Sequence, residues 1–351
     1  MNLKEIRENI DLLDSKILRL LNHRMELALM AKRLKPQIED RERERELLDR
    51  IGGNWKGLIN AELIERIYIE IINESKNLQQ KDNKLIAFQG EHGAYSEVAS
   101  RKWNSDLIPV PCSGFAEIFE GVTSGLYDYG IVPVENTLGG SVDQVNRLLI
   151  NTDLNVVGAV ELLIHHCLLT LPGTDYREVS AVYSHPQALA QCRYFLARNK
   201  LKPVQHYNTA GAARMLAEKK LKGSAAIGSR LSAQLYNLEI IKEDIEDLDR
   251  NVTRFLVLSK EENREEGDKC SVIFSTEHKA GTLFRVLEVF ARKNINLTRI
   301  ESIPNEPGSY AFFLDFMGSN KDDKVVKALE EAEEITTDFK LMGCYKERKV
   351  V

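Results

Sequence analysis

The spacing of apolar residues changes twice along this 351-residue chain, and these changes limit the possible folds more than any other feature. Between residues 3 and 80, apolar side chains recur every three or four positions, which predicts helices. Between 85 and 259, short apolar runs alternate with helical windows, the pattern of an α/β domain. Between 269 and 347 the order is strand, helix, strand, strand, helix, strand, as in an α+β ferredoxin-like domain. We therefore expect a multidomain protein.

Two polar segments separate these regions. Residues 79–84 carry only amide and charged side chains, and residues 260–268 are almost wholly charged. Such stretches are typical of linkers, and the length is far above that of one average domain. We expect domain boundaries that give residues 1–80, 84–260 and 269–347.

The composition excludes several classes of protein. Hydrophobic residues make up 43% and charged residues 29%, as in globular proteins. The net charge of -5, from 48 basic and 53 acidic residues, argues against nucleic acid or an anionic membrane as a partner. No apolar run suggests a signal peptide or a membrane span. The five cysteines are scattered and form no CxxC pair, so we expect no structural zinc, no disulfide framework and a reduced, cytoplasmic protein.

The helical region has polar residues where apolar ones are expected. Its first helix repeats apolar residues from Leu3 to Leu34, but Arg24 occupies one position of this seam. The inward positions of the three helices together hold four cations, two anions and two neutral polar groups: Arg7, Arg24, Lys35, Arg43, Asp40, Glu44, Ser75 and Gln79. The surplus of positive charge suits a small dianion, because arginine binds carboxylates through paired hydrogen bonds. Arginines paired internally with glutamates are the alternative explanation.

The first helix also predicts a partner chain. A helix of about 32 residues spans about 48 Å, whereas the third helix, of about 20 residues, spans about 30 Å. The shorter helices of the same chain cannot cover the long one. We therefore expect a homodimer or a larger homo-oligomer, in which a second copy covers it.

These polar positions resemble the all-helical type of chorismate mutase. The resemblance rests on Arg7, Arg24, Lys35, Asp40-x-x-Arg43-Glu44 and Ser75-x-x-x-Gln79. It implies that all eight residues bind chorismate, with Arg7 supplied by the partner chain and the arginines at the two carboxylates. It also implies that Lys35 and Gln79 donate to the ether oxygen, that Asp40 and Glu44 hold the ring hydroxyl, and that Lys35, Gln79 and Glu44 are the catalytic groups.

Polar residues also follow the predicted strands of the α/β region, where open α/β sheets bind ligands. Glu135-Asn136-Thr137 follows the strand at 129–134, and Ser184-His185-Pro186-Gln187 ends the strand at 181–184. Each motif alone is weak evidence, because serines at such positions commonly cap helices. His185 is interpreted as structural, and so is the pair His165-His166, which lacks a third metal ligand. No nucleotide motif is present, and we expect no nucleotide, metal or other cofactor.

Together these motifs resemble prephenate dehydratase over residues 85–260. The resemblance rests on Gly90-x-x-Gly93-x-Tyr95-Ser96, Glu135-Asn136-Thr137-x-x-Gly140-Ser141-Val142, Ser184-His185-Pro186-Gln187 with Gln191-Cys192, and Thr253-Arg254-Phe255. It implies two α/β subdomains around a cleft, as in a periplasmic binding protein, with prephenate bound by Glu135, Asn136, Thr137, Ser184, Gln191, Thr253 and Arg254. Thr253 is then the catalytic residue, acting as an oriented hydrogen-bond donor, and Glu135 is the alternative proton source.

Residues 269–347 resemble an ACT domain, a regulatory module for small ligands. The resemblance rests on Gly281-Thr282-Leu283-Phe284 and on Asn296-Leu297-Thr298-x-Ile300-Glu301-Ser302-Ile303-Pro304. It implies phenylalanine as an effector, held near Gly281, Leu283, Asn296, Glu301 and Ser302. Thr282 and Ile303 replace the alanine and arginine of the phenylalanine-binding version, so we expect weaker inhibition that Ile303→Arg restores. A dimerisation domain without a ligand is the alternative.

The three resemblances together imply a bifunctional enzyme of phenylalanine synthesis. It would rearrange chorismate to prephenate and then decarboxylate and dehydrate prephenate to phenylpyruvate. Two alternatives remain open: a prephenate dehydratase with a non-catalytic helical arm, and a cytosolic binding protein that senses amino acids.

Overall fold

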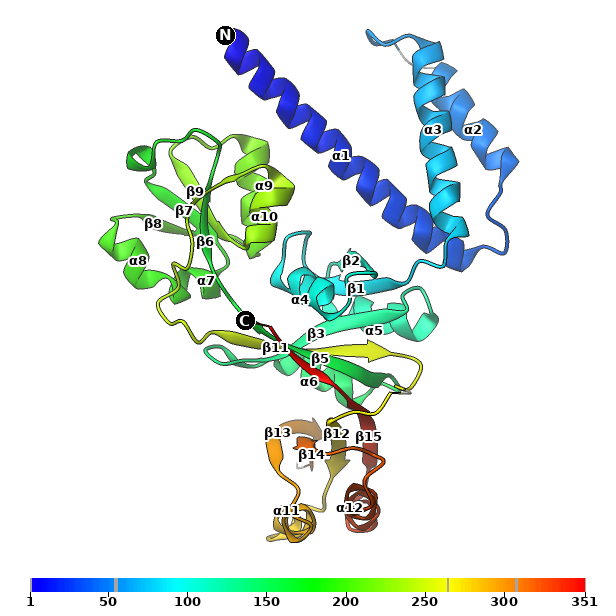
Figure 1. The fold of residues 1–351 in the computed structure, drawn as a ribbon, viewed down its shortest axis with the longest axis vertical. Helices are drawn as coiled ribbons and strands as arrows, with labels where there is room; N and C mark the ends of the chain where they lie inside the picture. Colours follow the sequence, from blue (N-terminus) through cyan, green and yellow to red (C-terminus); the bar gives the residue numbers. More distant parts are fainter. Residues whose placement is uncertain (1, 54–55, 264, 307–308, 351) are drawn as a thin grey trace. The chain divides into compact units, whose positions relative to one another are not determined.

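The computed structural model describes residues 2–53, 56–263, 265–306 and 309–350 (Figure 1). The chain divides into two compact units, residues 1–84 and 85–351, and the division falls at the end of the polar segment 79–84. No helix in the described part of the chain is long and apolar enough to cross a membrane.

The described part of the first unit is helical, with α1 (Leu3–Leu34), α2 (Arg41–Gly53) and α3 (Ala61–Gln80). Asp40 Oδ1 accepts the backbone N–H of Arg43 at 3.0 Å, and Asn60 Oδ1 accepts that of Leu63 at 2.8 Å. These bonds satisfy N–H groups in the first turns of α2 and α3, which fixes where both helices begin. Helix α3 packs against both α1 and α2. The apolar stripe of α1 stays exposed within its own chain: Leu3, Ile6, Ile10, Leu13, Ile17 and Leu20.

The first lobe of the second unit is built on one mixed sheet. Its strands are β1 (Leu85–Gln89), β2 (Ile108–Cys112), β3 (Tyr129–Asn136), β4 (Gly140–Ser141), β5 (Asn155–Leu163), β11 (Val252–Ser259) and β16 (Glu347–Val350). Their order is β16-β5-β11-β3-β1-β2, with β4 paired to β3. Strands β1, β2 and β3 are parallel, whereas β11 runs antiparallel to β3 and β5. Helices α4 (Tyr95–Trp103), α5 (Phe115–Ser124) and α6 (Asp143–Ile150) pack on this sheet.

The second lobe has its own sheet, in the order β10-β6-β9-β7-β8. These strands are β6 (Cys167–Thr170), β7 (Ala181–Ser184), β8 (Lys202–Gln205), β9 (Ser224–Gly228) and β10 (Glu239–Lys242). The helices of this lobe are α7 (Pro186–Gln191), α8 (Arg193–Arg198), α9 (Thr209–Lys219) and α10 (Arg230–Tyr236), with a 3₁₀ turn, η1 (Tyr176–Glu178). The chain passes between the lobes after β5 and again after β10 (Figure 1). This confirms the predicted pair of α/β subdomains.

The C-terminal region confirms the predicted ferredoxin-like order. Strands β12 (Lys269–Ser275), β13 (Leu297–Glu306), β14 (Ser309–Met317) and β15 (Phe339–Tyr345) form a sheet in the order β13-β14-β12-β15. Helices α11 (Thr282–Arg292) and α12 (Asp323–Glu334) contribute to a core with one face of this sheet, which includes Phe274, Val286, Phe290 and Leu314. Gly281, just before α11, has φ of +85°, a backbone region that favours glycine.

The last strand joins the C-terminal region to the first lobe. Strand β16 pairs in parallel with β5, so the chain returns to the sheet that carries β11. Gly343 of β15 also lies against β5, where an added Cβ would meet the backbone oxygen of Val156 at 2.2 Å. The sequence did not predict β16, because its run of charged residues has no strand pattern.

The prediction of reduced cysteines is wrong for one pair. Cys270 on β12 and Cys344 on β15 form a disulfide, although 74 residues separate them in sequence. The antiparallel register of these strands places the two residues opposite each other, which sequence spacing could not reveal. The other cysteines, Cys112, Cys167 and Cys192, are free and buried.

Candidate active sites

A cavity of about 390 Å³ lies among the three helices of the first unit. Of the eight residues predicted to bind chorismate, seven line it: Arg24, Lys35, Asp40, Arg43, Glu44, Ser75 and Gln79. Residues from three helices and one loop thus converge as the sequence predicted. The lining also includes Lys76, which the sequence analysis missed although its i+4 spacing from Ile72 puts it on the same helix face.

Hydrogen bonds hold several of these side chains in place. Arg24 Nη1 donates to Ser75 Oγ at 2.6 Å, and Ser75 Oγ donates to the backbone oxygen of Ile71 at 2.8 Å. Lys35 Nζ donates to the backbone oxygen of Ile38 at 2.8 Å. Gln79 is buried, and its Oε1 has no hydrogen-bond partner in the described structure. A buried amide without a partner is costly, so this position is prepared for a ligand.

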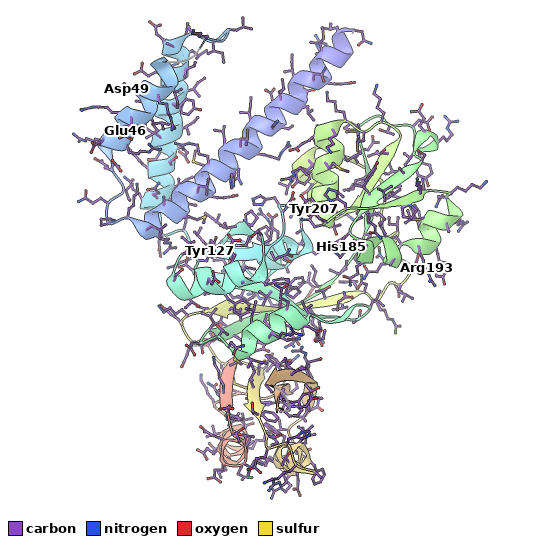
Figure 2. The ribbon with its side chains drawn as sticks, turned by 180° about the vertical axis from the view of Figure 1, so that it is seen from behind. Glu46, Asp49, Tyr127, His185, Arg193 and Tyr207 are labelled. Carbon is purple, nitrogen blue, oxygen red and sulfur yellow. A yellow bond between two sulfur atoms is a disulfide. The ribbon has the colours of Figure 1, made fainter. Side chains whose placement is uncertain are left out.

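The charges of this cavity remain unbalanced. Lys76 Nζ pairs with Glu44 Oε1 at 2.7 Å, and Arg43 Nη1 pairs at 3.1 Å with Oε2 of Glu46, which is labelled in Figure 2. Arg24 on α1 and Lys35 just after it also line the cavity, and in the described structure they donate to the Ser75 hydroxyl and to a backbone oxygen and not to a carboxylate. The cavity therefore favours an anionic ligand.

Arg7 is not part of this cavity in a single chain. It lies on the exposed N-terminal part of α1, seventeen residues before Arg24, which is about 25 Å along a helix. The prediction for Arg7 thus depends on a second copy of the chain, as the resemblance implied.

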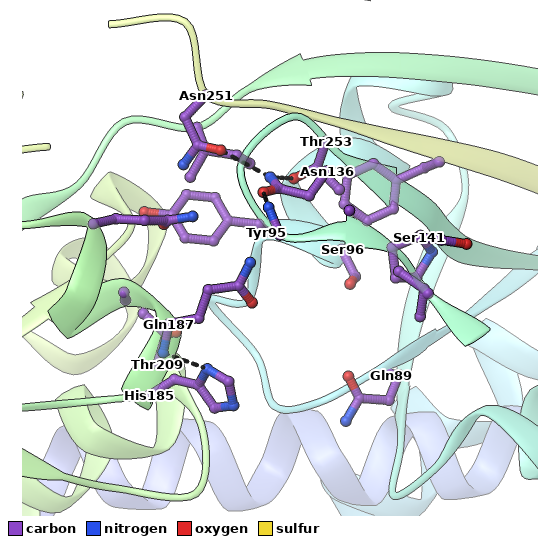
Figure 3. Close-up of a pocket in the computed structure, with 18 of the residues that line it drawn as sticks. Gln89, Tyr95, Ser96, Asn136, Ser141, His185, Gln187, Thr209, Asn251 and Thr253 are labelled. Atoms are coloured by element: carbon purple, nitrogen blue, oxygen red, sulfur yellow. Dashed lines mark hydrogen bonds between the residues drawn. The ribbon is translucent and has the colours of Figure 1, made fainter. Parts of the chain in front are cut away.

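A second cavity, of about 590 Å³, is a cleft lined by residues of both lobes of the second unit (Figure 3). Three predicted prephenate residues line it, namely Asn136, Gln191 and Thr253. Tyr95, Ser96, Ser141 and Gln187, which belong to the motifs of the resemblance, line it as well. His185 also lines it and accepts the N–H of Gln187 at the start of α7, so the interpretation of His185 as structural is incomplete.

Asn136 organises the end of this cleft where Thr253 lies (Figure 3). The register of β3 and β11 places Asn136 opposite Thr253. Asn136 Nδ2 donates to Thr253 Oγ1 and to Asn251 Oδ1, each at 2.8 Å. Its Oδ1 accepts the backbone N–H of Gly139 at 2.7 Å. Because Thr253 Oγ1 accepts the bond from Asn136, its own hydroxyl proton is left to donate elsewhere.

Two predicted residues, Glu135 and Arg254, lie on the opposite face of the same sheet. Neighbouring residues of a strand point to opposite faces, so Arg254 points away from the cleft that Thr253 lines. Arg254 is 3% exposed and bonds to Asp315, Glu347 and Tyr345. Glu135 Oε2 lies 3.4 Å from Arg299 Nε. The structure therefore corrects both assignments, and it leaves Glu135 too badly placed to supply a proton in the cleft.

Ser184 and Thr137 are also absent from the cleft lining. Ser184 is fully buried, and its Oγ donates to the backbone oxygen of Ile227 at 2.8 Å, which ties β7 to β9. Thr137 Oγ1 donates to the backbone oxygen of Arg250 at 3.0 Å. Both side chains bond to backbone of neighbouring segments, so these two predictions are corrected as well.

His166 is a cleft residue that the sequence analysis treated as structural. The pair His165-His166 lies between β5 and β6 and not inside a strand, so it belongs to one of the connections between the lobes. His166 Nε2 lies 2.8 Å from Gln191 Oε1, and Nδ1 lies 2.9 Å from Tyr95 Oη. Burial lowers the pKa of His166, so the ring is neutral near pH 7.

The lining of the cleft contains neither lysine nor arginine. No described residue that lines it carries either side chain. Instead, α4, α6 and α9 begin at the cleft, since Tyr95, Asp143 and Thr209 line it. No side chain caps α4 or α6. Uncapped helix N-termini attract carboxylates, but the Asn208 side chain caps α9 and Asp143 adds a negative charge at α6, so α4 is the most favourable of the three for an anion.

His165 has the further ligands that the sequence analysis did not find. Its Nδ1 lies 2.8 Å from Glu246 Oε1 and 3.1 Å from Asp244 Oδ1, and the three groups are close enough to hold a metal ion. The connection between β10 and β11 brings both carboxylates beside the β5–β6 connection. Both carboxylates lie at the same imidazole nitrogen, so the three side chains form a polar cluster at the connections between the lobes.

A third cavity, of about 550 Å³, lies in the C-terminal region beside α11. Gly281, Leu283 and Ser302, predicted to hold the effector, line it together with Tyr310 and Phe312. Glu301 and Asn296 do not line it. Glu301 alternates with Ser302 along β13 and so faces the other side of the sheet. Asn296 precedes β13, and its backbone oxygen accepts the N–H of Met317 at 2.9 Å.

The two departures from the phenylalanine-binding pattern have separate structural causes. Thr282 Oγ1 donates to the backbone oxygens of Glu277 and Lys279, at 2.9 and 3.0 Å, and so closes the turn before α11. Ile303 is 5% exposed and lies on the sheet face opposite Ser302. An arginine at 303 would be buried away from the cavity. We therefore no longer expect Ile303→Arg to restore inhibition by phenylalanine. We expect this substitution to lower the stability of the C-terminal region.

Comparison with known families agrees with this arrangement. The family models that match are chorismate mutase type II at residues 6–80, prephenate dehydratase at 86–263 and the ACT domain at 271–334. The bifunctional chorismate mutase/prephenate dehydratase of Escherichia coli (strain K12) is 35% identical, over 99% of this chain and 96% of that protein. The one of Aquifex aeolicus is 36% identical, over 98% and 97%. Arogenate dehydratase 2 of Petunia hybrida is 38% identical, over 77% of this chain and 73% of that protein.

Solved structures resemble the second unit. A prephenate dehydratase of Arthrobacter aurescens in complex with L-Phe has a TM-score of 0.69 at 29% identity, covering 75% of this chain and 89% of that chain. A protein described as a quorum quenching acylase, GqqA, has a TM-score of 0.70 at 32% identity, covering 75% and 97%. The matched models follow the same order as the helical cavity, the two-lobed cleft and the C-terminal sheet. The chain belongs to the family of bifunctional chorismate mutase/prephenate dehydratases.

Proposed function

We propose that the helical cavity rearranges chorismate to prephenate and that the cleft converts prephenate to phenylpyruvate, in the synthesis of phenylalanine. The observation that carries this proposal is the hydrogen bond from Asn136 to Thr253 at the end of a cleft without cations. Because Thr253 Oγ1 accepts this bond, the hydroxyl proton of Thr253 remains available to donate into the cleft. The helical cavity adds the positive charge that a dicarboxylate such as chorismate requires.

In the helical cavity, the reaction needs positioning and no nucleophile. The rearrangement breaks a carbon–oxygen bond and forms a carbon–carbon bond in one step, while negative charge grows on the ether oxygen. Lys35 and Gln79 line the cavity, and the Lys35 ammonium and the Gln79 Nε2 amide group would donate to that oxygen. Fixed donors stabilise the developing charge, and Arg24 holds the substrate in a compact conformation.

In the cleft, the hydroxyl group of prephenate must leave with a proton while carbon dioxide departs. The electron pair of the breaking carbon–carbon bond enters the ring and expels hydroxide, and the ring becomes aromatic. A hydrogen bond from Thr253 to the leaving oxygen stabilises the negative charge that develops there. The proton that completes water comes from Thr253 or from solvent through it. The N-terminus of α4 at Tyr95, which no side chain caps, would hold a substrate carboxylate.

The direct test is an assay with chorismate, prephenate and arogenate supplied separately. We expect prephenate to form from chorismate and phenylpyruvate to form from either, as followed by chromatography. Arogenate is included because plant relatives carry that activity in their names. Turnover of arogenate without turnover of prephenate would contradict the proposed substrate of the cleft. No turnover of chorismate would reduce the helical unit to a dimerisation arm.

We also propose that two chains form the helical sites together. The exposed apolar stripe of α1 needs a cover, and Arg7 lies too far from the cavity of its own chain to reach it. A second copy that packs along α1 would bury the stripe and supply Arg7 to the partner's cavity.

Subunit complementation tests this arrangement. Arg7→Ala and Arg24→Ala should each have little mutase activity, since each removes a cation at a carboxylate. When both variants are co-expressed and assemble at random, about half of the dimers are mixed, and each mixed dimer has one site with both arginines. We expect mutase activity to recover to about a quarter of wild type. If the mixture stays as inactive as the single variants, Arg7 does not act across the subunit boundary.

We further propose phenylalanine as the effector in the C-terminal cavity. Gly281 and the start of α11 offer backbone groups for an amino acid, while Leu283, Tyr310 and Phe312 offer an apolar and aromatic surface for its ring. We expect L-phenylalanine to bind, as measured by calorimetry, and to lower the dehydratase rate. D-phenylalanine, with the same ring, is the control. If neither enantiomer produces heat of binding, phenylalanine is not the effector and this region is a dimerisation module.

A further inference from the structure

A buried group of charged residues lies directly behind the strand that carries Thr253. It consists of Arg254 on β11, Lys269 on β12, Asp315 on β14 and Glu347 on β16, and is called the interdomain cluster here. Arg254 Nη1 pairs with Asp315 Oδ2, and Arg254 Nε pairs with Glu347 Oε1 at 2.6 Å. Lys269 Nζ pairs with Glu347 Oε2 at 2.8 Å. Two positive and two negative side chains therefore neutralise each other away from water.

The cluster joins the first lobe to the C-terminal region. Arg254 belongs to the sheet of the cleft, whereas Lys269 and Asp315 belong to the C-terminal sheet. Tyr345 of β15 adds a neutral contact, since Arg254 Nη2 donates to its Oη at 3.0 Å. Arg254 is 3% exposed and Asp315 is 0% exposed, so solvent cannot replace either partner. All three nitrogens of the Arg254 guanidinium bond to residues of the C-terminal sheet or of the strand that follows it.

The position of Arg254 links this cluster to the catalytic end of the cleft. Arg254 and Thr253 are consecutive residues of β11 and point to opposite faces of the sheet. On one face Thr253 accepts the bond from Asn136, and on the other face Arg254 is held by the cluster. A change in how Arg254 is held would move the Thr253 hydroxyl, because one peptide unit separates them.

The same C-terminal strands line the effector cavity. Strand β14 carries Tyr310 and Phe312 of that cavity, and Asp315 follows Phe312 by three residues, or about 10 Å along a strand. Strand β13 carries Ser302 of the cavity and Arg299, whose Nη2 donates to Asn146 Oδ1 at 3.3 Å. Asn146 Nδ2 in turn donates to Ser141 Oγ of the cleft at 2.6 Å. Strand β13 is thus connected through Asn146 to Ser141 of the cleft, and strand β14 through Asp315 to Arg254, the neighbour of Thr253.

The alternative is that the interdomain cluster only attaches the C-terminal region to the first lobe, because charged side chains that are buried in proteins are generally paired. Such pairs contribute little net stability, since desolvation of the charges offsets their attraction. The interdomain cluster is therefore poorly explained as a means of attachment, which β16 and the close contact at Gly343 already provide. Its placement one residue from Thr253 favours a role in the reaction.

We propose that Arg254 is a positioning residue for the dehydratase reaction, which fixes Thr253 through Asp315 and Glu347 and makes its position depend on the C-terminal sheet. The dependence on an effector rests on the proposed function of the C-terminal cavity. The positioning of Thr253 rests on the cluster alone.

The test removes the Arg254–Asp315 pair as a whole, in Arg254→Met/Asp315→Leu. Replacing both partners by apolar residues of similar size leaves no unpaired charge, so the fold should survive. We expect dehydratase kcat to fall by about tenfold to a hundredfold with little change in KM, because a displaced catalytic group costs rate more than binding. Phenylalanine should still bind but no longer inhibit. Mutase activity, in the separate helical unit, should stay normal, and the retained binding of phenylalanine reports that the second unit is folded.

Two further variants complete the design. Lys349→Met removes the exposed pair with Glu161, which also joins β16 to β5 but does not reach Thr253. It should leave kcat and inhibition unchanged. Arg254→Lys keeps the buried cation but loses the paired geometry, so it should lower kcat even if the double variant fails to fold. Normal kcat and normal inhibition in Arg254→Lys and in the folded double variant would overturn the proposal.

Hydrogen exchange at residues 252–258 provides a readout without turnover. Amide exchange of this strand should increase in Arg254→Lys and remain unchanged in Lys349→Met. If the wild-type protein fails to convert prephenate, the proposed function fails, whereas the exchange measurement still decides whether Arg254 holds the strand. Unchanged exchange together with unchanged kinetics would assign the cluster to attachment only.

Discussion

Arg24→Ala should lower chorismate mutase turnover by about a hundredfold or more while dehydratase turnover of supplied prephenate stays near normal. Arg24 lines the helical cavity, and its Nη1 is fixed by Ser75 Oγ at 2.6 Å. Without the guanidinium, a substrate carboxylate would be desolvated without a partner, which typically costs about 2–5 kcal/mol. The dehydratase should be spared because the cleft belongs to the other compact unit. Separate assays with chorismate and with prephenate measure both rates.

Arg45→Ala is a matched control for this prediction. Arg45 is an exposed arginine of α2 that does not line the cavity, so its removal changes the charge of the helical unit by the same amount. We expect mutase activity in Arg45→Ala to remain near that of wild type. An equal loss in both variants would mean that net charge or folding, and not a contact at Arg24, is responsible. An equal loss of mutase and dehydratase in Arg24→Ala would mean that Arg24 holds the fold.

The helical site could be predicted largely from sequence because helices have a well-defined period. Once the apolar seam of α1 was recognised, the position of Arg24 on the inward face followed from steps of three and four residues. The same reasoning placed Ser75 and Gln79 on α3, and both line the cavity. Arg7 shows the limit of this reasoning. It shares the same helix but does not line the cavity of its own chain, so periodicity alone does not show which site it serves.

The cleft could be predicted less completely, because a strand reverses its side-chain direction at every residue. The motif at 135–137 gave three candidates, but only Asn136 lines the cleft. Likewise Thr253 lines the cleft whereas Arg254 faces the C-terminal sheet. A motif identifies the correct strand, yet the face of each residue depends on register and on bulges, such as the irregularity between Arg254 and Phe255. His166 was missed because its role depends on a connection between lobes that no local pattern describes.

The location of Arg254 changes how substrate recognition in the cleft is explained. A predicted cation at the substrate is in fact part of a neutral cluster behind the sheet. Recognition of a dicarboxylate then depends on helix N-termini, amides and hydroxyls, whose direction is fixed by the fold. Such groups discriminate by geometry more than by charge.

Thr253→Val should lower dehydratase turnover by about a hundredfold to a thousandfold, with mutase turnover unchanged, so that prephenate accumulates from chorismate. Valine has nearly the shape of threonine, so the register of β11 with β3 should persist. The variant loses the hydroxyl that accepts the bond from Asn136 Nδ2 at 2.8 Å and that remains free to donate into the cleft. Losing one donor to a developing negative charge typically costs about 2.7–4 kcal/mol of transition-state stabilisation. Steady-state kinetics with prephenate should show the loss in kcat and little change in KM.

Two further substitutions test whether the hydroxyl of Thr253, and not the rest of its side chain or the surrounding strands, is responsible for the loss of turnover. Thr253→Ser retains the hydroxyl and should keep most of the dehydratase rate, since Asn136 can still hold the oxygen. Thr137→Val removes a nearby hydroxyl that bonds to the backbone oxygen of Arg250 and does not line the cleft, so it should affect stability more than kcat. If Thr253→Val forms phenylpyruvate at the normal rate, the donor to the leaving hydroxyl must be another group of the lining. His166 and Tyr95 would then be the candidates, because Glu135 faces Arg299 across the other side of the sheet.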